Sequence, residues 1–231
     1  MSSPLPANVH VSQHPCLLAK LSQLRSSTAT ARETKGLVHE ISLILGCEAL
    51  SKGVKAGNTG EKAQTPLGNS YETTSLSPEN IALVPILRSG LGMVDAFHLL
   101  LPHPTPVHHL GLFREPTTLQ PVEYYNNLPY HSSSSTIPTR TIPPLAILLD
   151  PVIATGGTSS AAIQTLREWG VQRVLVVSIL ASAEGVRRAA GEWPDGVDVW
   201  VAAVDDTVDA KGMIRPGIGD VGDRLFLTVG K

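Results

Sequence analysis

The sequence contains little of what marks several classes of protein. Only two of its 231 residues are cysteine, and Cys16 and Cys47 show no CxxC spacing. This excludes a disulfide framework and a zinc knuckle, and it favours a reducing compartment. The first residues lack the charged segment and apolar run of a signal peptide, and no stretch is long enough to span a bilayer. We therefore expect a cytoplasmic protein with no membrane partner.

Charge of one sign is also lacking. The 18 Lys and Arg residues nearly balance the 20 Asp and Glu residues, which gives a net charge of −2. Aromatic residues make up only 4% of the chain, and the three tryptophans are scattered. Nucleic-acid binding proteins typically carry a basic stripe, so we expect no nucleic-acid partner. Hydrophobic residues reach 42%, which excludes disorder of the whole chain.

The N-terminal part predicts two helices followed by a loop. Leucines recur at helical spacing over residues 16–25. Thr30 and Glu33 have the spacing of a capping box, which places the start of a second helix. These N-terminal helices occupy residues 12–50, where they would form a cap or an association surface. Residues 51–80 are polar and rich in Gly, Ser and Thr, so we expect a flexible loop there.

From residue 81 onward, apolar strands alternate with helices. We expect this part and the N-terminal helices to form a single domain that spans residues 1–231. This order predicts an α/β fold with a parallel sheet flanked by helices, whose ligands bind at the carboxyl ends of the strands. A Ser- and Pro-rich segment at 131–144 is expected to be a flexible loop. The predicted strands are 81–87, 107–113, 121–125 (one arm of a hairpin), 145–149, 173–180 and 197–204, and the predicted helices are 90–101, 159–169 and 184–191.

The most informative segment is 145–159, LAILLDPVIATGGTS. An apolar strand ends in Asp150, and a loop with two glycines and two threonines then leads into a helix. Gly156 and Gly157 let backbone N–H groups approach an anion, and the helix N-terminus adds a partial positive charge. The segment matches neither GxxxxGK[ST] nor GxGxxG, so it predicts a phosphate monoester site, with Asp150 accepting from sugar hydroxyls. A Gly-rich turn without a ligand is the alternative.

This loop resembles the 5-phosphoribosyl 1-diphosphate (PRPP) signature of the type I phosphoribosyltransferases. Its Asp150-Pro151 pair is similar to that of the uracil phosphoribosyltransferases. Three further segments, Val84–Met93, Gly111–Tyr125 and Pro216–Phe226, resemble that family in the same order. The resemblance implies the type I phosphoribosyltransferase fold, with N-terminal helices and a hairpin arm. The implied activity is a glycosyltransferase reaction of pyrimidine salvage, in which uracil and PRPP give UMP and pyrophosphate.

The resemblance also implies site residues and partners. It assigns catalysis to Arg88, Arg114, Asp150 and Asp220. Mg²⁺ is expected with PRPP, without an assigned protein ligand, and the chain is expected to form a homodimer or homotetramer. Some relatives are activated by GTP, and the sequence leaves open whether this chain is. The implied PRPP-binding residues are Arg88, Arg114, Asp150, Pro151, Val152, Ile153, Ala154, Thr155, Gly156, Gly157, Thr158 and Asp220, and the implied uracil-binding residues are Ile214, Gly219, Asp220 and Val221.

The sequence departs from the family pattern in the base pocket. Met213 stands where many members have an aromatic residue, and Ser89 and Val221 stand where many have alanine. These positions leave open a phosphoribosyltransferase for another base. The sequence also leaves open a catalytically silent regulator that binds uridine nucleotides, and an RNA-binding regulator on the same fold. The Asp205-Asp206 pair at a strand end is expected to form a turn, with contact to a metal ion as the alternative.

Overall fold

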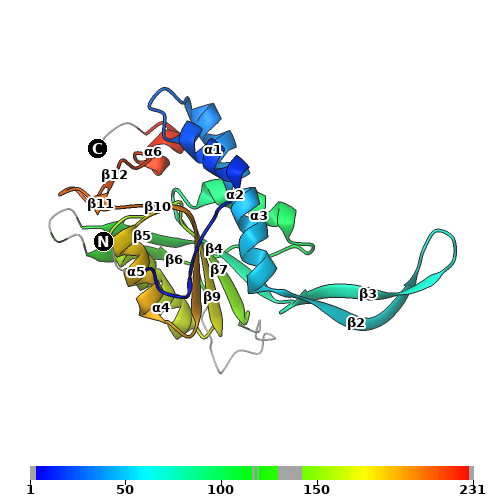
Figure 1. The fold of residues 1–231 in the computed structure, drawn as a ribbon. Coiled ribbons are helices and arrows are strands. Elements are labelled where there is room, and N and C mark those ends of the chain that lie inside the picture. The colour runs from blue at the N-terminus through cyan, green and yellow to red at the C-terminus, as the bar shows by residue number, and fades with distance from the viewer. Residues whose placement is uncertain (1–3, 116–117, 119, 130–141, 229–231) are drawn as a thin grey trace.

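The computed structural model describes residues 4–115, 118, 120–129 and 142–228. A sheet of eight strands forms its centre (Figure 1). Neighbouring strands run parallel, except that β6 is antiparallel to β5. The α/β fold with a mainly parallel sheet is thereby confirmed. The strand order is β1 (Val9–Val11), β10 (Val197–Asp205), β9 (Arg173–Ser182), β7 (Leu145–Leu149), β4 (Ile81–Leu87), β5 (Leu110–Arg114) and β6 (Pro121–Asn126), and β8 (Val152–Ile153) pairs with β9.

Helices cover both faces of this sheet. Strand residues alternate between the two cores, as the pleat requires: in β7, Leu145 and Ile147 face one core, and Ala146 and Leu148 face the other. The first core packs against α1 (Pro15–Leu24), α2 (Ala31–Gly53) and α3 (Leu91–Leu100), and the second against α4 (Gly157–Trp169) and α5 (Ala183–Glu192). Both faces of the central strands are therefore buried, which explains their continuous apolar sequences.

The predicted N-terminal helices and the capping box are confirmed. The Thr30 hydroxyl accepts from the Glu33 N–H at 3.3 Å, and the Glu33 carboxylate accepts from the Thr30 N–H at 2.7 Å. Several short elements were not predicted: β1, β8, the small hairpin of β11 (Thr207–Val208) and β12 (Ile214–Arg215), and α6 (Val221–Phe226). Each is too short to show a periodic pattern.

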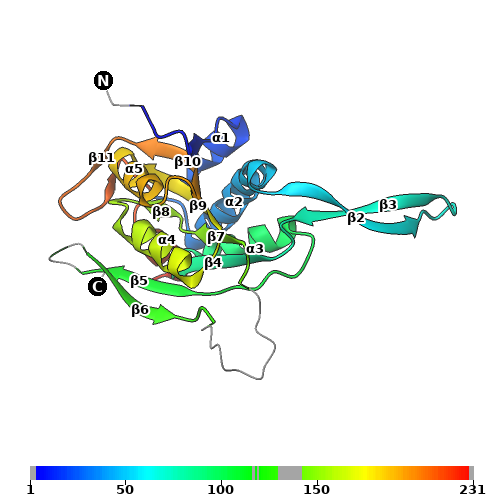
Figure 2. The ribbon, with the colours of Figure 1, turned by 90° about the horizontal axis from the view of Figure 1, so that it is seen from below.

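The prediction of a loop over residues 51–80 is wrong. Helix α2 continues to Gly53, and β2 (Lys55–Gln64) and β3 (Ser70–Ser77) then form an antiparallel hairpin. The hairpin projects away from the rest of the molecule in both views (Figures 1 and 2). Its residues are almost all exposed or half-buried, so its strands need no apolar face and have the composition of a loop. Of the loop predicted at 131–144, all but the last three residues lie outside the described residues.

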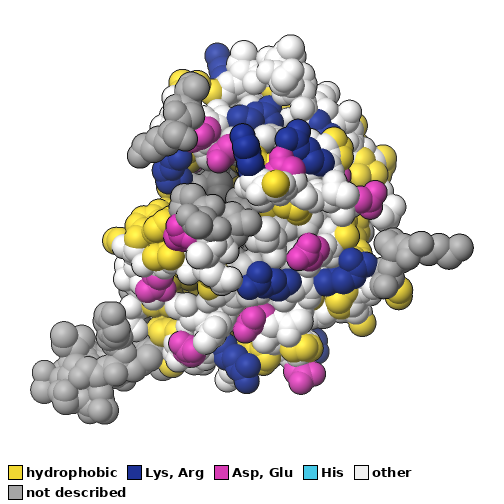
Figure 3. Space-filling model, turned by 90° about the vertical axis from the view of Figure 1, so that its left-hand side faces the viewer, with side chains coloured by type: hydrophobic (Ala, Val, Ile, Leu, Met, Phe, Trp, Pro, Cys, Tyr) yellow, Lys and Arg dark blue, Asp and Glu magenta, His cyan; other side chains and the backbone are white. Residues whose placement is uncertain are grey.

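Surface charge is mixed on the face opposite the hairpin. Lys and Arg side chains there are interspersed with Asp and Glu side chains (Figure 3). Among the described residues, none of the helices combines the length and apolar character that a membrane span needs.

Candidate active site

A cavity of about 350 Å³ opens at the carboxyl edge of the sheet. It is lined by the loops that follow β4 and β7, by the β5–β6 hairpin and by residues 212–222. Ligands of parallel sheets bind at this edge, because the loops between strands and helices converge there. The cavity therefore lies where the sequence motifs predict the site.

The segment from Asp150 to Thr158 forms one side of the cavity and has a fixed backbone. The Asp150 carboxylate is buried, and it accepts a hydrogen bond from the Val152 N–H at 3.4 Å. The Ser182 hydroxyl donates to the Ala154 carbonyl at 2.5 Å and accepts from the Gly185 N–H at 2.8 Å. The start of α5 thus supports the loop from behind.

The backbone conformation and the close packing at position 156 require a glycine. Its φ of +76° is left-handed, and a Cβ there would lie 2.5 Å from the Gly185 carbonyl oxygen. Helix α4 begins at the next residue, and Thr155, Thr158 and Ser159 near its start line the cavity. This part of the cavity combines backbone N–H groups, hydroxyls and a helix N-terminus, which is a suitable environment for a phosphate group.

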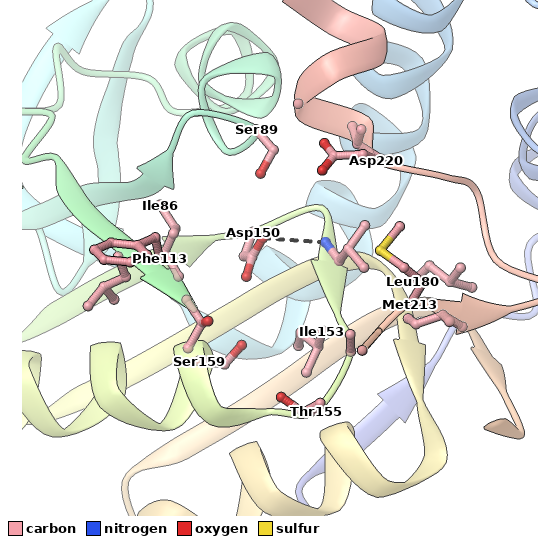
Figure 4. Close-up of a pocket in the computed structure, with 18 of the residues that line it drawn as sticks. Ile86, Ser89, Phe113, Asp150, Ile153, Thr155, Ser159, Leu180, Met213 and Asp220 are labelled. Atoms are coloured by element: carbon pink, nitrogen blue, oxygen red, sulfur yellow. Dashed lines mark hydrogen bonds between the residues drawn. The ribbon is translucent and has the colours of Figure 1, made fainter. Parts of the chain in front are cut away.

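The polar side chains of the cavity lie in a definite order (Figure 4). Thr155 and Ser159 lie at one end, Ser89 and Asp220 lie at the other, and the Asp150 carboxylate lies between them. A ligand with a phosphate at one end and hydroxyls in its middle would place the hydroxyls against Asp150. Ser159 is not among the PRPP-binding residues that the resemblance implies, but it lines the same end of the cavity as Thr155.

Arg88 supplies a positive charge at the rim. Its side chain is half-exposed, and Nη2 lies 3.1 Å from Asp223 Oδ1 while Nη1 lies 2.9 Å from Thr228 Oγ1. An ion pair this exposed contributes little to stability. The guanidinium can therefore exchange these partners for the phosphate oxygens of a ligand at small cost.

Asp220 has two structural roles at the far end of the cavity. It is the N-cap of α6, where its Oδ1 accepts from the Asp223 N–H at 3.0 Å, and it also lines the cavity. Ile214 and Val221 are buried beside it, and Gly219 has a left-handed φ of +71°. The expected uracil-binding residues thus line the same cavity, and α6 explains the Gly-Asp pattern that precedes it.

Asp209 organises the turn that carries Met213, a role that the sequence did not reveal. Its Oδ1 accepts from the N–H groups of Lys211 and Met213 at 2.9 and 3.0 Å. Its Oδ2 lies 2.6 Å from Nη2 of Arg215. Hydrogen bonds from the Met213 N–H and from Arg215 hold the pKa of the Asp209 carboxyl below its ordinary value. The signal available in the sequence was the Asp-x-x-Gly turn pattern at 209–212.

The chain bends at Asp206 in place of the expected turn, and Asp205 itself has a structural role. It ends β10 as a buried carboxylate that binds the guanidinium of Arg25 with both oxygens, at 2.7 and 2.8 Å. Burial raises the pKa of this carboxyl, but hydrogen bonds from Arg25 and from the Gly217 N–H, together with the charge of Arg25, outweigh it and hold the pKa below its ordinary value. The carboxylate therefore stays charged at neutral pH.

Most of the residues expected at the site line the cavity, with three exceptions. Pro151 and Gly157 are not among the described lining residues: the Pro151 carbonyl accepts from backbone N–H groups of β9, and Gly157 is the first residue of α4. Arg114 ends β5, and its side chain lies outside the described part of the structure. The lining residues that had been expected are Arg88, Asp150, Val152, Ile153, Ala154, Thr155, Gly156, Thr158, Ile214, Gly219, Asp220 and Val221.

Several lining residues were not expected to contact a ligand. Phe113 and Tyr124 come from the β5–β6 hairpin, with ring centroids 6.1 Å apart, and Leu180 comes from β9. Scattered aromatic and aliphatic residues carry no local signal, so only the fold brings them to the cavity. Among the described residues, no three His, Cys, Asp or Glu side chains are grouped so as to hold a metal ion.

The family model and the most similar sequences point to the same protein family. The sequence model of the uracil phosphoribosyltransferase family matches residues 11–228. The uracil phosphoribosyltransferase of Roseiflexus sp. (strain RS-1) is 41% identical over 96% of this chain and 99% of its own, and that of Finegoldia magna is 39% identical with the same coverage. Among solved structures, the AQ2163 protein of Aquifex aeolicus is similar with a TM-score of 0.82 and 29% identity, covering 96% of this chain and 100% of its own.

Proposed function

The chain belongs to the uracil phosphoribosyltransferase family, and from this premise we propose that its cavity converts uracil and PRPP into UMP and pyrophosphate. The observation that carries the proposal is the order of groups along the cavity. A glycine-rich loop with two threonines lies at one end, a buried carboxylate lies in the middle, and a second carboxylate, Asp220, lies at the far end. Arg88 lines the cavity close to Gly222, two residues after Asp220. This order matches PRPP, with uracil beside the second carboxylate.

Each part of PRPP has a suitable partner. The segment from Thr155 to Thr158 and the start of α4 would bind the 5-phosphate through N–H groups and hydroxyls. Asp150 would accept hydrogen bonds from the ribose hydroxyls. Arg88 would bind the pyrophosphate, because a planar guanidinium forms paired hydrogen bonds to phosphate oxygens and keeps its charge. Arg114, at the end of β5, is proposed to bind PRPP as well.

The uracil ring would lie among Ile214, Gly219 and Val221, with Met213 against it. Backbone N–H and C=O groups near Gly219 would pair with the alternating donors and acceptors of the ring. Cytosine presents a different pattern, which would leave at least one buried polar group without a partner. Met213 is flexible and apolar, so it can cover the ring in place of an aromatic residue.

The reaction forms a bond between N1 of uracil and C1 of the ribose as the bond from C1 to the pyrophosphate oxygen breaks. Pyrophosphate leaves with the electron pair, and N1 loses its proton. Positive charge develops on the ribose during this exchange, so the carboxylates of Asp150 and Asp220 would stabilise it electrostatically. Asp220 is also the group proposed to help remove the N1 proton.

The donor set of the cavity fits a magnesium ion that PRPP brings with it. Asp150 and Asp220 are the acidic groups among its described lining residues, and Mg²⁺ prefers such oxygens together with phosphates and water. When bound, the ion would neutralise charge on the departing pyrophosphate. These two carboxylates are the residues that would contact the ion or its water ligands.

The test is an assay of UMP and pyrophosphate formation from PRPP and Mg²⁺, with uracil, cytosine and the purine bases compared in parallel. Turnover with uracil alone is expected. Turnover with another base would change the assigned substrate. Mg²⁺-dependent PRPP binding without turnover of any base would support a silent regulator in place of an enzyme.

Two further properties are proposed from the family resemblance. The chain is expected to form a homodimer or homotetramer, which sedimentation at micromolar concentration tests, and a monomer would contradict it. GTP is the candidate activator. A rise in turnover when GTP is added at subsaturating PRPP would support that role, and unchanged turnover at every GTP concentration would exclude it.

A further inference from the structure

The segment that carries two of the proposed base-binding residues, Gly219 and Asp220, is held by side chains from outside it. Residues 216–220 connect β12 to α6, and Ile218, Gly219 and Asp220 line the cavity. Two arginines converge on the backbone of this segment. Arg25 directly follows α1, and Arg224 lies in α6.

Arg25 and Asp205 together occupy both backbone groups of Gly217. Arg25 Nη1 donates to the Gly217 carbonyl at 2.9 Å, and Asp205 Oδ2 accepts from the Gly217 N–H at 2.9 Å. The two side chains form a paired ion bridge at the same time. Gly217 has a left-handed φ of +71°. A Cβ at this position would lie 2.2 Å from the Ile214 carbonyl oxygen, so no other residue fits. The direction of its peptide groups is therefore fixed from several sides.

Arg224 holds the next residue of the segment. Its Nη1 donates to the carbonyls of Ile218 and Leu24, both at 2.7 Å, and its Nη2 donates to the carbonyl of Ser26 at 3.1 Å. Leu24 and Ser26 flank Arg25 at the end of α1. Both arginines thus attach the base-binding segment to the same short stretch of the N-terminal helices.

On this basis we propose that Arg25, Asp205 and Arg224, which together form a Gly217 clamp, are positioning residues that set the geometry of uracil recognition. The proposal rests on the proposed function. The clamp bonds the backbone of residues 217 and 218, immediately before Gly219. Recognition of a base by backbone groups depends on their direction, and small misplacements in an active site have large effects. The end of α1 would therefore contribute to base specificity without touching the base.

The test compares Arg25→Lys with Arg173→Lys. Lysine keeps the charge of Arg25 but cannot form its planar fork of hydrogen bonds. Arg173 also makes an ion pair, with Nη2 2.9 Å from Asp198 Oδ2, but this pair is more exposed and lies at the start of β9, away from the cavity. We expect Arg25→Lys to raise KM for uracil about tenfold, the loss of about one hydrogen bond. KM and Kd for PRPP should stay within about twofold, and Arg173→Lys should leave all three constants unchanged.

Asp205→Asn and Arg224→Lys repeat the test if Arg25→Lys fails to fold. If the wild type is active and the folded variants keep its KM for uracil, the positioning role of the clamp is overturned and the proposed function stands. Equal losses of uracil and PRPP affinity, in step with a lower melting temperature, would assign the clamp a structural role and would also overturn the proposal. No wild-type turnover of uracil would overturn both this proposal and the proposed function.

Discussion

Gly156→Ala should damage both the proposed phosphate-binding loop and the stability of the chain. The substitution adds one methyl group at a left-handed φ of +76°. That Cβ would meet the Gly185 carbonyl oxygen at 2.5 Å and the Arg188 Cβ at 3.0 Å. The first contact is with backbone, so it cannot be relieved by rotating a side chain. Either the loop or the start of α5 must move.

The size of the effect follows from two terms. A left-handed alanine costs about 1–2 kcal/mol relative to glycine. For a chain of this length, each kcal/mol lowers the melting temperature by about 2–4 °C. We therefore expect a decrease of at least about 2–8 °C, before the close contact is counted. If the movement removes one N–H donor from the 5-phosphate, about 1.5–3 kcal/mol of binding free energy is lost, which is about a 10- to 150-fold rise in Kd for PRPP.

Thermal melting and calorimetry with PRPP and Mg²⁺ measure these two quantities. Gly36→Ala is the matched control, since Gly36 lies within α2 and a Cβ there would meet nothing within 4 Å. The control should keep its PRPP affinity and gain up to about 1 kcal/mol of stability from better helix propensity. An unchanged melting temperature and PRPP Kd in Gly156→Ala would refute the role given to this glycine.

Three more variants test the site. Asp220→Asn should lower kcat on the order of 100-fold with almost no change in melting temperature, because asparagine also caps helices, and near wild-type turnover would remove Asp220 from the chemistry. Arg88→Lys should raise KM for PRPP about tenfold, the loss of one paired hydrogen bond, without destabilising the fold, and an unchanged KM would show that Arg88 does not bind the pyrophosphate. Because the folded-state pKa of Asp205 is lowered, its contribution to stability is present above the unfolded pKa of about 3.9 and is lost as pH falls through the folded value. Urea unfolding should therefore show a steeper loss of stability below about pH 4 in the wild type than in Asp205→Asn, and equal slopes would contradict the assignment.

Local signals in the sequence predicted the central sheet and one end of the cavity. Strands β4 and β7 are buried on both faces, so their apolar runs stand out without any knowledge of their partners. The capping box at Thr30 and the glycine-rich loop before α4 are likewise complete within a few residues. Such features are predictable because the interactions that stabilise them join neighbours in the chain.

The elements that were missed depend on distant partners or on no apolar core. The β2–β3 hairpin is exposed on both sides, so hydrogen bonding between its polar strands leaves no periodic hydrophobic pattern. Asp205 and Arg25 are separated by 180 positions in the sequence, and no motif around either residue indicates that the two form an ion pair. The apolar residues that line the cavity also come from distant parts of the sequence, so no local pattern predicts that they meet. The sequence therefore identified the groups that are proposed to bind phosphate, whereas the groups that are proposed to orient the base became visible only once the ends of α1, β10 and α6 were brought together.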